Sequence, residues 1–329
     1  MDKLLVALII VIIIAIAVLA GRKSLRIATI NLEDGGAGYE KEFGELFSQY
    51  DIVIAREVNT HSGDNNAALI AKNIGWYSSR VVNDCAVLSR YPVESIAADG
   101  KNLSHTGTLI LKDLIAVIVR APKPVIVFPV HLNDEPYQPF SVLGVKYKTD
   151  ADRLSADIFV KTPGGPIDDS YTISAHAQIA RGAELSRVLK VADEIYAANG
   201  IPQIIAGDFN EPSHLDWTAR AIRAGVVPIE VAYPASMQMQ KANFTDTYRA
   251  VYPDEIVYMG STWPTSHGKV LSELTMWDDS PISNEHGGIV KRYLSARIDY
   301  IYVRDAYVLS SERKLTSSDH YALGSVIRI

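Results

Sequence analysis

The stretch Gln203–Asn210, QIIAGDFN, predicts a short buried strand that ends in polar residues. Its β-rich apolar run is followed directly by Asp208 and Asn210, where the strand would leave its sheet. The preceding segment, from about Ala177 to Ala198, carries its apolar residues on one helical face. We therefore expect a helix that packs on the sheet containing this strand, with polar groups gathered at the carboxyl end of the strand.

The same alternation of short apolar runs and amphipathic segments continues along the chain. The runs that predict strands are Leu25–Asn31, Asp51–Glu57, Cys85–Ser89, Leu114–Val119, Val125–Val130, Gln203–Asp208, Ile298–Val303 and about Gly324–Ile329. The segments that predict helices are Tyr39–Gln49, Asn65–Asn73, Ala177–Ala198 and Leu215–Ala224. The Pro-, Gly- and Asp-rich stretch from Asn133 to about Tyr171 indicates a long excursion, which is often functional. Strands without a regular strand–helix–strand period predict two packed sheets with helices outside, in one domain.

Polar residues recur at the ends of these apolar runs. An isolated acid after a strand usually caps a helix or solvates a turn. Asp299 is a stronger signal, because it lies inside a strand-like run, where an acid without a partner is costly. The repetition of one layout along the chain favours a shared functional site. The residues concerned are Asn31, Glu33, Glu57, His131, Asp208, Asn210, Asp299, Asp319 and His320.

Seven motifs that contain these residues follow one another in a fixed order. They are Ala28–Asn31 (ATIN), Asp51–Val58 (DIVIAREV), Val87–Pro92 (VLSRYP), Pro129–Leu132 (PVHL), Gly207–Asn210 (GDFN), Arg297–Tyr300 (RIDY) and Ser318–His320 (SDH). The ordered set resembles the endonuclease/exonuclease/phosphatase superfamily of metal-dependent phosphoesterases and covers about residues 25–329. The resemblance implies a DNase I-like α/β fold, a four-layer sandwich of two packed mixed β-sheets flanked by helices.

The resemblance also implies a metal site. Glu57 would be the principal metal ligand, Asn31 would assist it, and Asp319 would lie close to the metal. The expected ion is Mg²⁺, with Mn²⁺ as an alternative. Hard cations of this kind take oxygen ligands and keep several waters, so one or two carboxylates suffice.

Five further residues would carry the catalysis by the same resemblance. Asp208 would orient or deprotonate the attacking water, and Asn210 would hold that water or a phosphoryl oxygen. His320 would contact the scissile phosphate, with Asp299 holding its ring, and His131 would contact a phosphoryl oxygen. At this point the base can be either Asp208 or His320.

Three positions need a separate interpretation. Arg56 stands where the family usually has Gln; it either binds substrate phosphate or lies on the opposite sheet face, which we favour. Glu33 either adds a carboxylate to the metal site or is a solvated loop acid. Cys85 is expected to be a buried, inert thiol, and a single cysteine excludes an internal disulfide and a cysteine-based zinc site.

The amino terminus carries 17 consecutive apolar residues, Leu4–Ala20. Their length predicts a single-pass N-terminal membrane anchor over residues 1–24, ahead of a catalytic domain over residues 25–329. The alternative is a signal peptide cut after Ala20, which would leave a secreted or periplasmic protein. The anchor implies a membrane partner, and no protein partner is implied.

Together these features predict a Mg²⁺-dependent phosphoesterase that hydrolyses a phosphodiester or phosphomonoester by attack of an activated water. The alternatives are a nuclease acting on DNA or RNA, and a phosphodiesterase of membrane lipids such as sphingomyelin or phosphoinositides. A formal net charge of −6 gives little support to a nuclease, which profits from Lys and Arg clusters. The non-enzymatic alternative is a membrane-tethered binding protein on an inactive fold.

Overall fold

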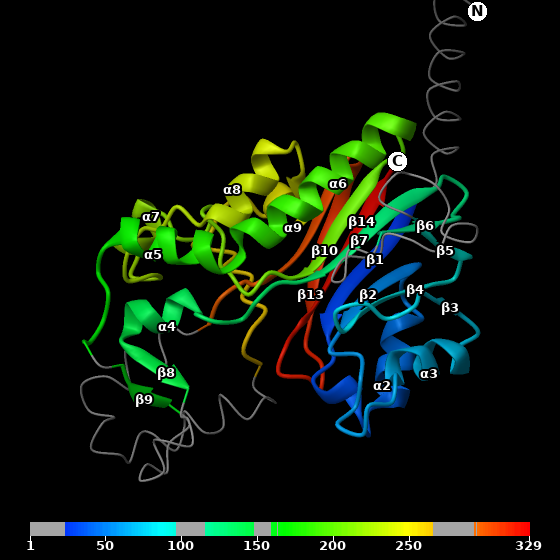
Figure 1. The fold of residues 1–329 in the computed structure, drawn as a ribbon, viewed down its shortest axis with the longest axis horizontal. Helices are drawn as coiled ribbons and strands as arrows, with labels where there is room; N and C mark the ends of the chain where they lie inside the picture. Colours follow the sequence, from blue (N-terminus) through cyan, green and yellow to red (C-terminus); the bar gives the residue numbers. More distant parts are fainter. Residues whose placement is uncertain (1–23, 97–115, 148–158, 163, 266–292, 294) are drawn as a thin grey trace, which may run out of the picture.

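Two six-stranded sheets form the centre of the computed structural model, which describes residues 24–96, 116–147, 159–162, 164–265, 293 and 295–329 (Figure 1). The first sheet contains, in spatial order, β13 (Tyr307–Lys314), β14 (Ala322–Arg328), β1 (Ser24–Asn31), β2 (Ile52–Arg56), β4 (Cys85–Ser89) and β3 (Tyr77–Ser78). The second contains β11 (Thr245–Asp246), β12 (Asp299–Arg304), β10 (Gln203–Asp208), β7 (Val125–His131), β6 (Ala116–Val119) and β5 (Val93–Ile96). Both sheets are mixed, since β1 is parallel to β2 and antiparallel to β14, while β10 is parallel to β7 and antiparallel to β12.

Helices and short elements connect and cover these strands. The helices are α2 (Glu40–Phe47), α3 (Asn66–Asn73), α4 (Gln138–Leu143), α5 (Ser170–Ala177), α6 (Ala183–Asn199), α7 (Ala219–Arg223), α8 (Pro234–Lys241) and α9 (Thr247–Val251). A 3-10 turn covers Asp34–Gly36, and a π-helical turn, Gln178–Gly182, joins α5 to α6. A separate two-stranded sheet pairs β8 (Val145–Tyr147) with β9 (Phe159–Lys161).

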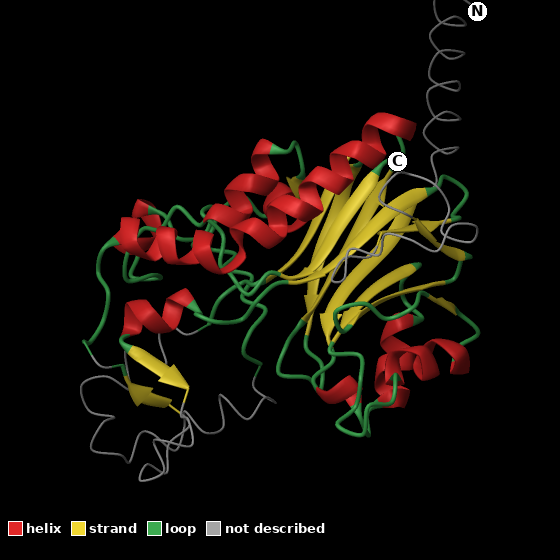
Figure 2. Cartoon of the chain, viewed as in Figure 1, coloured by secondary structure: helices red, strands yellow, loops and turns green. Residues whose placement is uncertain are grey.

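Alternation along the strands divides the core into layers. On β1, Ile27 faces the other sheet, whereas Ile30 packs against α2 and α3 on the outer face. The outer face of the second sheet packs against α6 and α8, through side chains such as Leu185 and Met239. The order is therefore helix, sheet, sheet, helix (Figure 2), which confirms the predicted four-layer DNase I-like sandwich.

Strand register brings the polar strand ends into two adjacent rows. In the second sheet, Asp208 pairs in register with His131 on one side and with Asp299 on the other. In the first sheet, Asn31 pairs in register with Arg56. Residues from distant parts of the sequence therefore meet at one end of the sandwich.

A buried charge network holds the entry into β12. The Arg297 guanidinium is fully buried and donates to both carboxylate oxygens of Asp216, with Nε–Oδ2 at 3.0 Å and Nη2–Oδ1 at 3.1 Å. It also donates to Asp246 at 2.7 Å, and Arg249 shares the Asp216 carboxylate at 2.6 Å. Because Arg297 lies two residues before Asp299, this network fixes where Asp299 enters the sheet.

Several local predictions differ from the structure. The long helix begins earlier and is interrupted by the π-helical turn. The helix predicted to start at Leu215 starts at Ala219, because Thr218 Oγ1 caps it by accepting from Ala221 N at 3.0 Å. The excursion after Asn133 contains α4 and the β8–β9 pair, and residues 148–158 lie outside the described residues.

The expected membrane localisation needs correction. Across the described ranges of the chain, no helix combines the length and the apolar character that crossing a bilayer requires. Leu4–Ala20, on which the predicted anchor and the secreted alternative both depended, falls outside those ranges. On this finding we withdraw the membrane localisation, while the domain boundary near residue 24 stays a prediction.

Gly207 provides a test of the packing between β10 and β7. A Cβ atom at this position, where φ is +152°, would lie 1.8 Å from the carbonyl oxygen of Val130 on the paired strand. We expect Gly207→Ala to reduce the free energy of unfolding by about 3 kcal/mol or more, because backbone atoms cannot move aside as a flexible side chain can. Urea unfolding followed by circular dichroism measures the change.

Gly200 is the matched control for this substitution. Its φ of +63° is also left-handed, but no atom lies within 4 Å of the place that a Cβ atom would take there. Gly200→Ala should therefore cost only the backbone strain, about 1–2 kcal/mol. Equal losses for the two variants would contradict a steric role for Gly207.

Candidate active site

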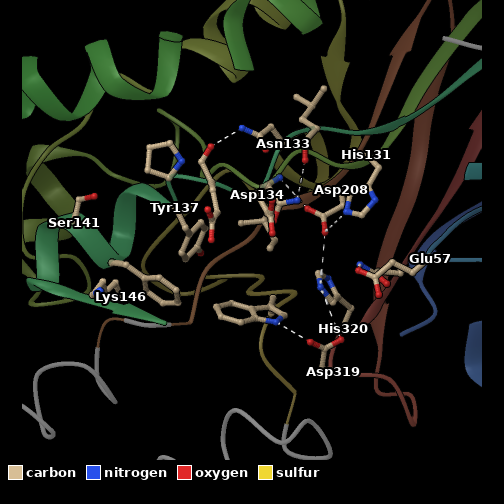
Figure 3. Close-up of a pocket in the computed structure, with 18 of the residues that line it drawn as sticks. Glu57, His131, Asn133, Asp134, Tyr137, Ser141, Lys146, Asp208, Asp319 and His320 are labelled. Atoms are coloured by element: carbon tan, nitrogen blue, oxygen red, sulfur yellow. Dashed lines mark hydrogen bonds and ion pairs between the residues drawn. The ribbon is translucent and has the colours of Figure 1, made fainter. Parts of the chain in front are cut away.

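Seven of the eight predicted site residues line one cavity of about 1100 Å³ at the end of the sandwich (Figure 3). They are Asn31, Glu57, His131, Asp208, Asn210, Asp319 and His320. The eighth, Asp299, is fully buried behind His320. The structure thus brings these eight residues together at one end of the sandwich.

A buried histidine–carboxylate pair forms the centre of the site. His320 Nδ1 donates to Asp299 Oδ2 at 2.8 Å. Burial lowers the pKa of His320, but the charge and hydrogen bond of Asp299, together with Asp208 and Asp319, outweigh burial and raise it to about 10. Burial alone would raise the pKa of Asp299, but the charges of His320 and Arg56 hold it below its usual value. At neutral pH the pair is therefore an imidazolium and a carboxylate.

Asp208 faces this pair from the end of β10. Its Oδ2 lies 3.7 Å from His320 Nε2 and 4.0 Å from His131 Nε2, while Oδ1 accepts from the backbone N–H of Asn210 at 2.8 Å. Burial and the negative charge of Asp299 raise the pKa of Asp208 above its usual value. A carboxylate of raised pKa is a stronger proton acceptor, and Asp208 lies at the cavity wall with a histidine ring on each side of it.

Glu57 and Asp319 supply oxygen atoms on the other side of the cavity. Asn31 Nδ2 donates to Glu57 Oε1 at 2.7 Å and so orients that carboxylate, while Trp263 Nε1 donates to Asp319 Oδ2 at 3.0 Å. Asp319 Oδ1 also accepts from Ser318 Oγ at 3.4 Å, and both carboxylate residues are partly exposed to the cavity. Two partly exposed carboxylates, with the buried Asn31 amide orienting one of them, fit a hydrated Mg²⁺ or Mn²⁺ ion.

Asp208, Asp299 and His320 also bring carboxylate oxygens and a ring nitrogen within 4.8 Å of one another, as metal ligands can. Their contacts argue against a metal between them. Both Asp299 oxygens are already occupied, by Arg56 and by His320, and Asp299 is fully buried. A cation there would also face the positive charges of Arg56 and His320, so the Glu57 side of the cavity is the better site.

Neither Glu33 nor Arg56 lines the cavity, so neither is placed to contact a substrate directly. Glu33 Oε2 accepts from the backbone N–H of Asp319 at 3.0 Å, so this acid holds the loop that carries Asp319 and His320. Arg56 lies on the sheet face opposite the neighbouring Ala55 and is fully buried, which agrees with the favoured sheet-face interpretation. Cys85 is buried, and burial raises the pKa of its thiol.

The cavity extends away from these groups along a wall that the strand-end pattern did not predict. Tyr137 and Phe140 from the excursion meet Trp263, with ring centroids 4.9 Å to 6.2 Å apart. Lys146 and Ser141 lie on this side of the cavity (Figure 3). The position of this wall depends on Arg181, which is buried and donates to the carbonyls of Asp134 and Pro136 at 3.2 Å and 3.0 Å.

The model of the Endonuclease/Exonuclease/phosphatase family matches residues 29–320, which include every residue of the site. The chain belongs to this family. Members of the endonuclease/exonuclease/phosphatase family are hydrolases of phosphate esters, and they generally use divalent metals. The family resemblance seen in the ordered motifs is thereby confirmed.

Individual proteins are similar to the chain at lower identity. A Caenorhabditis elegans protein, "Uncharacterized protein F14F9.5", is 24% identical over an alignment of 252 residues that covers 73% of this chain and 70% of that protein. A crystal structure of humanized D. rerio TDP2 is 14% identical, covers 93% of this chain and 99% of that one, and has a TM-score of 0.48. The Xenopus laevis APE2 catalytic domain is also 14% identical, with 93% of each chain covered and a TM-score of 0.47.

The raised pKa of His320 makes stability depend on pH. A histidine in an unfolded chain titrates near about 6.5. Between that value and about 10, the folded protein binds a proton at His320 that the unfolded chain lacks. The stability that this residue contributes is therefore complete below the lower value and is lost as pH rises toward the upper one.

We expect the difference in unfolding free energy between wild type and His320→Gln to shrink as pH rises through this window. Denaturant unfolding in EDTA, at several pH values from 6 to about 10, measures it. Comparison with the variant cancels the titration of groups on which His320 has no effect, such as Glu211, whose pKa burial raises to about 7. A difference that is constant or grows with pH would disprove the assignment.

Proposed function

We propose that this chain is a Mg²⁺-dependent phosphoesterase that hydrolyses a phosphate ester by attack of an activated water. The observation that carries the proposal is the hydrogen-bonded series Asp299–His320, with Asp208 3.7 Å beyond, facing a cavity that also contains Glu57 and Asp319. Burying an imidazolium between carboxylates costs several kcal/mol per ion, and a catalytic role at the cavity accounts for that cost.

Each residue would act according to its protonation state. Asp208 would be the base, because it lies 3.7 Å from His320 Nε2 and its raised pKa makes it a stronger proton acceptor, whereas the pKa of His320, about 10, keeps that ring protonated at neutral pH. His320 Nε2 and His131 would donate to phosphoryl oxygens, and Asn210 would hold the water near Asp208. Glu57, Asp319 and Asn31 would hold the Mg²⁺ ion, which when bound would neutralise charge on the phosphate.

The cavity lining favours a small substrate with a single phosphate and an apolar or aromatic group. Six carboxylates line it, whereas Lys146 is the one Lys or Arg among the described lining residues. A nucleic-acid strand would bring several phosphates against this surface, and strand-binding sites use Lys and Arg for that contact. The aromatic wall of Tyr137, Phe140 and Trp263 would instead contact the group esterified to a single phosphate.

Loss of the base, Asp208, or of the protonated donor, His320, should reduce turnover without changing the fold. We expect Asp208→Asn and His320→Gln each to lower kcat by at least about 100-fold, the effect of losing one acid–base group. EDTA should abolish wild-type activity, and added Mg²⁺ or Mn²⁺ should restore it. Hydrolysis of bis-p-nitrophenyl phosphate, followed at 405 nm, is the measurement.

The exposed Asp168 is the matched control, and Asp168→Asn should retain wild-type activity. Wild-type kcat in either site variant, or full activity in EDTA, would contradict the mechanism.

A substrate panel tests the cavity argument separately. We expect p-nitrophenyl phosphate esters and nucleoside monophosphates to be hydrolysed with a kcat/KM at least about 10-fold above that for plasmid or abasic DNA. Sphingomyelin and phosphoinositides in mixed micelles complete the panel. Efficient cleavage of DNA together with little cleavage of the small esters would overturn the proposed substrate class while leaving the phosphoesterase proposal intact.

A further inference from the structure

Arg56 is a fully buried cation between the two sheets. On β2, Ile52 and Ile54 face the inter-sheet core, and Arg56 follows them at the same alternation. Its guanidinium donates to Thr29 Oγ1 on β1 and to Asp299 Oδ1 on β12, and Nη1 also lies 3.4 Å from the Ile54 carbonyl oxygen. The guanidinium therefore joins strands of the two sheets at the point where the site begins.

The partner of Arg56 is the carboxylate that holds His320. Asp299 Oδ1 accepts from Arg56, and Oδ2 accepts from His320 Nδ1 at 2.8 Å. Thr262 Oγ1 fixes the backbone of the same residue by accepting from Asp299 N at 3.0 Å. With one oxygen occupied, the carboxylate cannot turn its other oxygen away from His320.

Stability alone does not account for a cation at this place. A buried ion pair often contributes no more to folding than apolar residues of similar volume, because desolvation offsets the attraction. The neighbouring positions Ile52 and Ile54 show that an apolar side chain is accommodated on this face. What an apolar residue could not supply is a donor that fixes the direction of the Asp299 carboxylate.

We propose that Arg56 is a positioning residue for the reaction, acting through Asp299 on His320. The inference rests on the proposed phosphoesterase function. Arg56 holds Asp299 Oδ1, Asp299 Oδ2 holds His320 Nδ1, and His320 Nε2 is thereby aimed at the cavity and Asp208, 3.7 Å away. A charge that never contacts substrate thus determines the direction of a group that does.

A double-mutant cycle with Asp299→Asn tests this order of action. We expect Arg56→Met to lower kcat by about 100-fold with KM nearly unchanged, the effect of misplacing a catalytic group. In the Asp299→Asn background, the same substitution should lower kcat by less than about 3-fold, because the residue through which Arg56 acts is already changed. Equal losses in the two backgrounds would overturn the proposal, since a merely structural role gives additive effects.

Arg304 supplies the control for loss of a buried arginine. It lies at the opposite end of β12, is 8% exposed, and pairs with Asp193 at 2.6 Å. Arg304→Met should lower the melting temperature while keeping kcat within about 3-fold of wild type. A kcat loss equal to that of Arg56→Met would overturn the proposal.

If Arg56→Met does not fold, Arg56→Lys replaces it in the double-mutant cycle and is judged by the same outcomes.

The NMR signal of the His320 Nδ1 proton tests the proposal without any substrate. In wild type it should be shifted downfield by the bond to Asp299; Arg56→Met should shift or broaden it, and Arg304→Met should leave it unchanged. An unchanged signal in Arg56→Met would overturn the role of Arg56. If the wild type hydrolyses no phosphate ester, the proposed function fails, and this signal still decides whether Arg56 positions His320.

Discussion

The site depends on the alignment of two sheets, because neither sheet contains it alone. The first sheet ends in Asn31 and Glu57, and the second in His131, Asp208 and Asp299. His320 returns from the loop before β14 in the first sheet to meet Asp299 of the second at 2.8 Å. One residue along a strand is about 3.3 Å, so a slide of one sheet by a single position would separate this pair. Packing between the sheets is thus the constraint on which the chemistry rests.

Buried arginines hold the segments that carry the functional groups next to the two sheets. Arg297 anchors the entry to β12 through Asp216 and Asp246, and Arg181 holds the carbonyls of the loop that forms the cavity wall. An apolar core packs without strong preference for direction, whereas a planar guanidinium accepts only certain placements of its partners. These residues therefore contribute orientation at places where loops, which have no sheet register, carry the functional groups.

The sequence predicted the strands that consist of apolar runs, including Cys85–Ser89 and Gln203–Asp208 at their observed bounds. It did not predict β13, because that strand is mostly exposed and is polar after Leu309, so its apolar run is only three residues long. The site residues could be selected because strand ends meet at one edge of a sheet. The contact between Arg56 and Asp299 could not be predicted from the sequence, because it joins residues 243 positions apart and depends on how one sheet lies on the other. The contact between Glu33 and Asp319, which are 286 positions apart, could not be predicted either.

The negative charge of the cavity lining explains why the proposed function requires a bound cation. Six carboxylates line the cavity, so a phosphate entering it without a metal would be repelled before any chemistry began. The imidazolium of His320 is positive, but two carboxylates already balance its charge. Asp299 lies 2.8 Å from its Nδ1, and Asp208 lies 3.7 Å from its Nε2. A divalent ion on Glu57 and Asp319 would neutralise these two carboxylates and place a positive charge next to the phosphate. The proposed metal would therefore act first on binding, and a chelator should weaken substrate affinity as well as turnover.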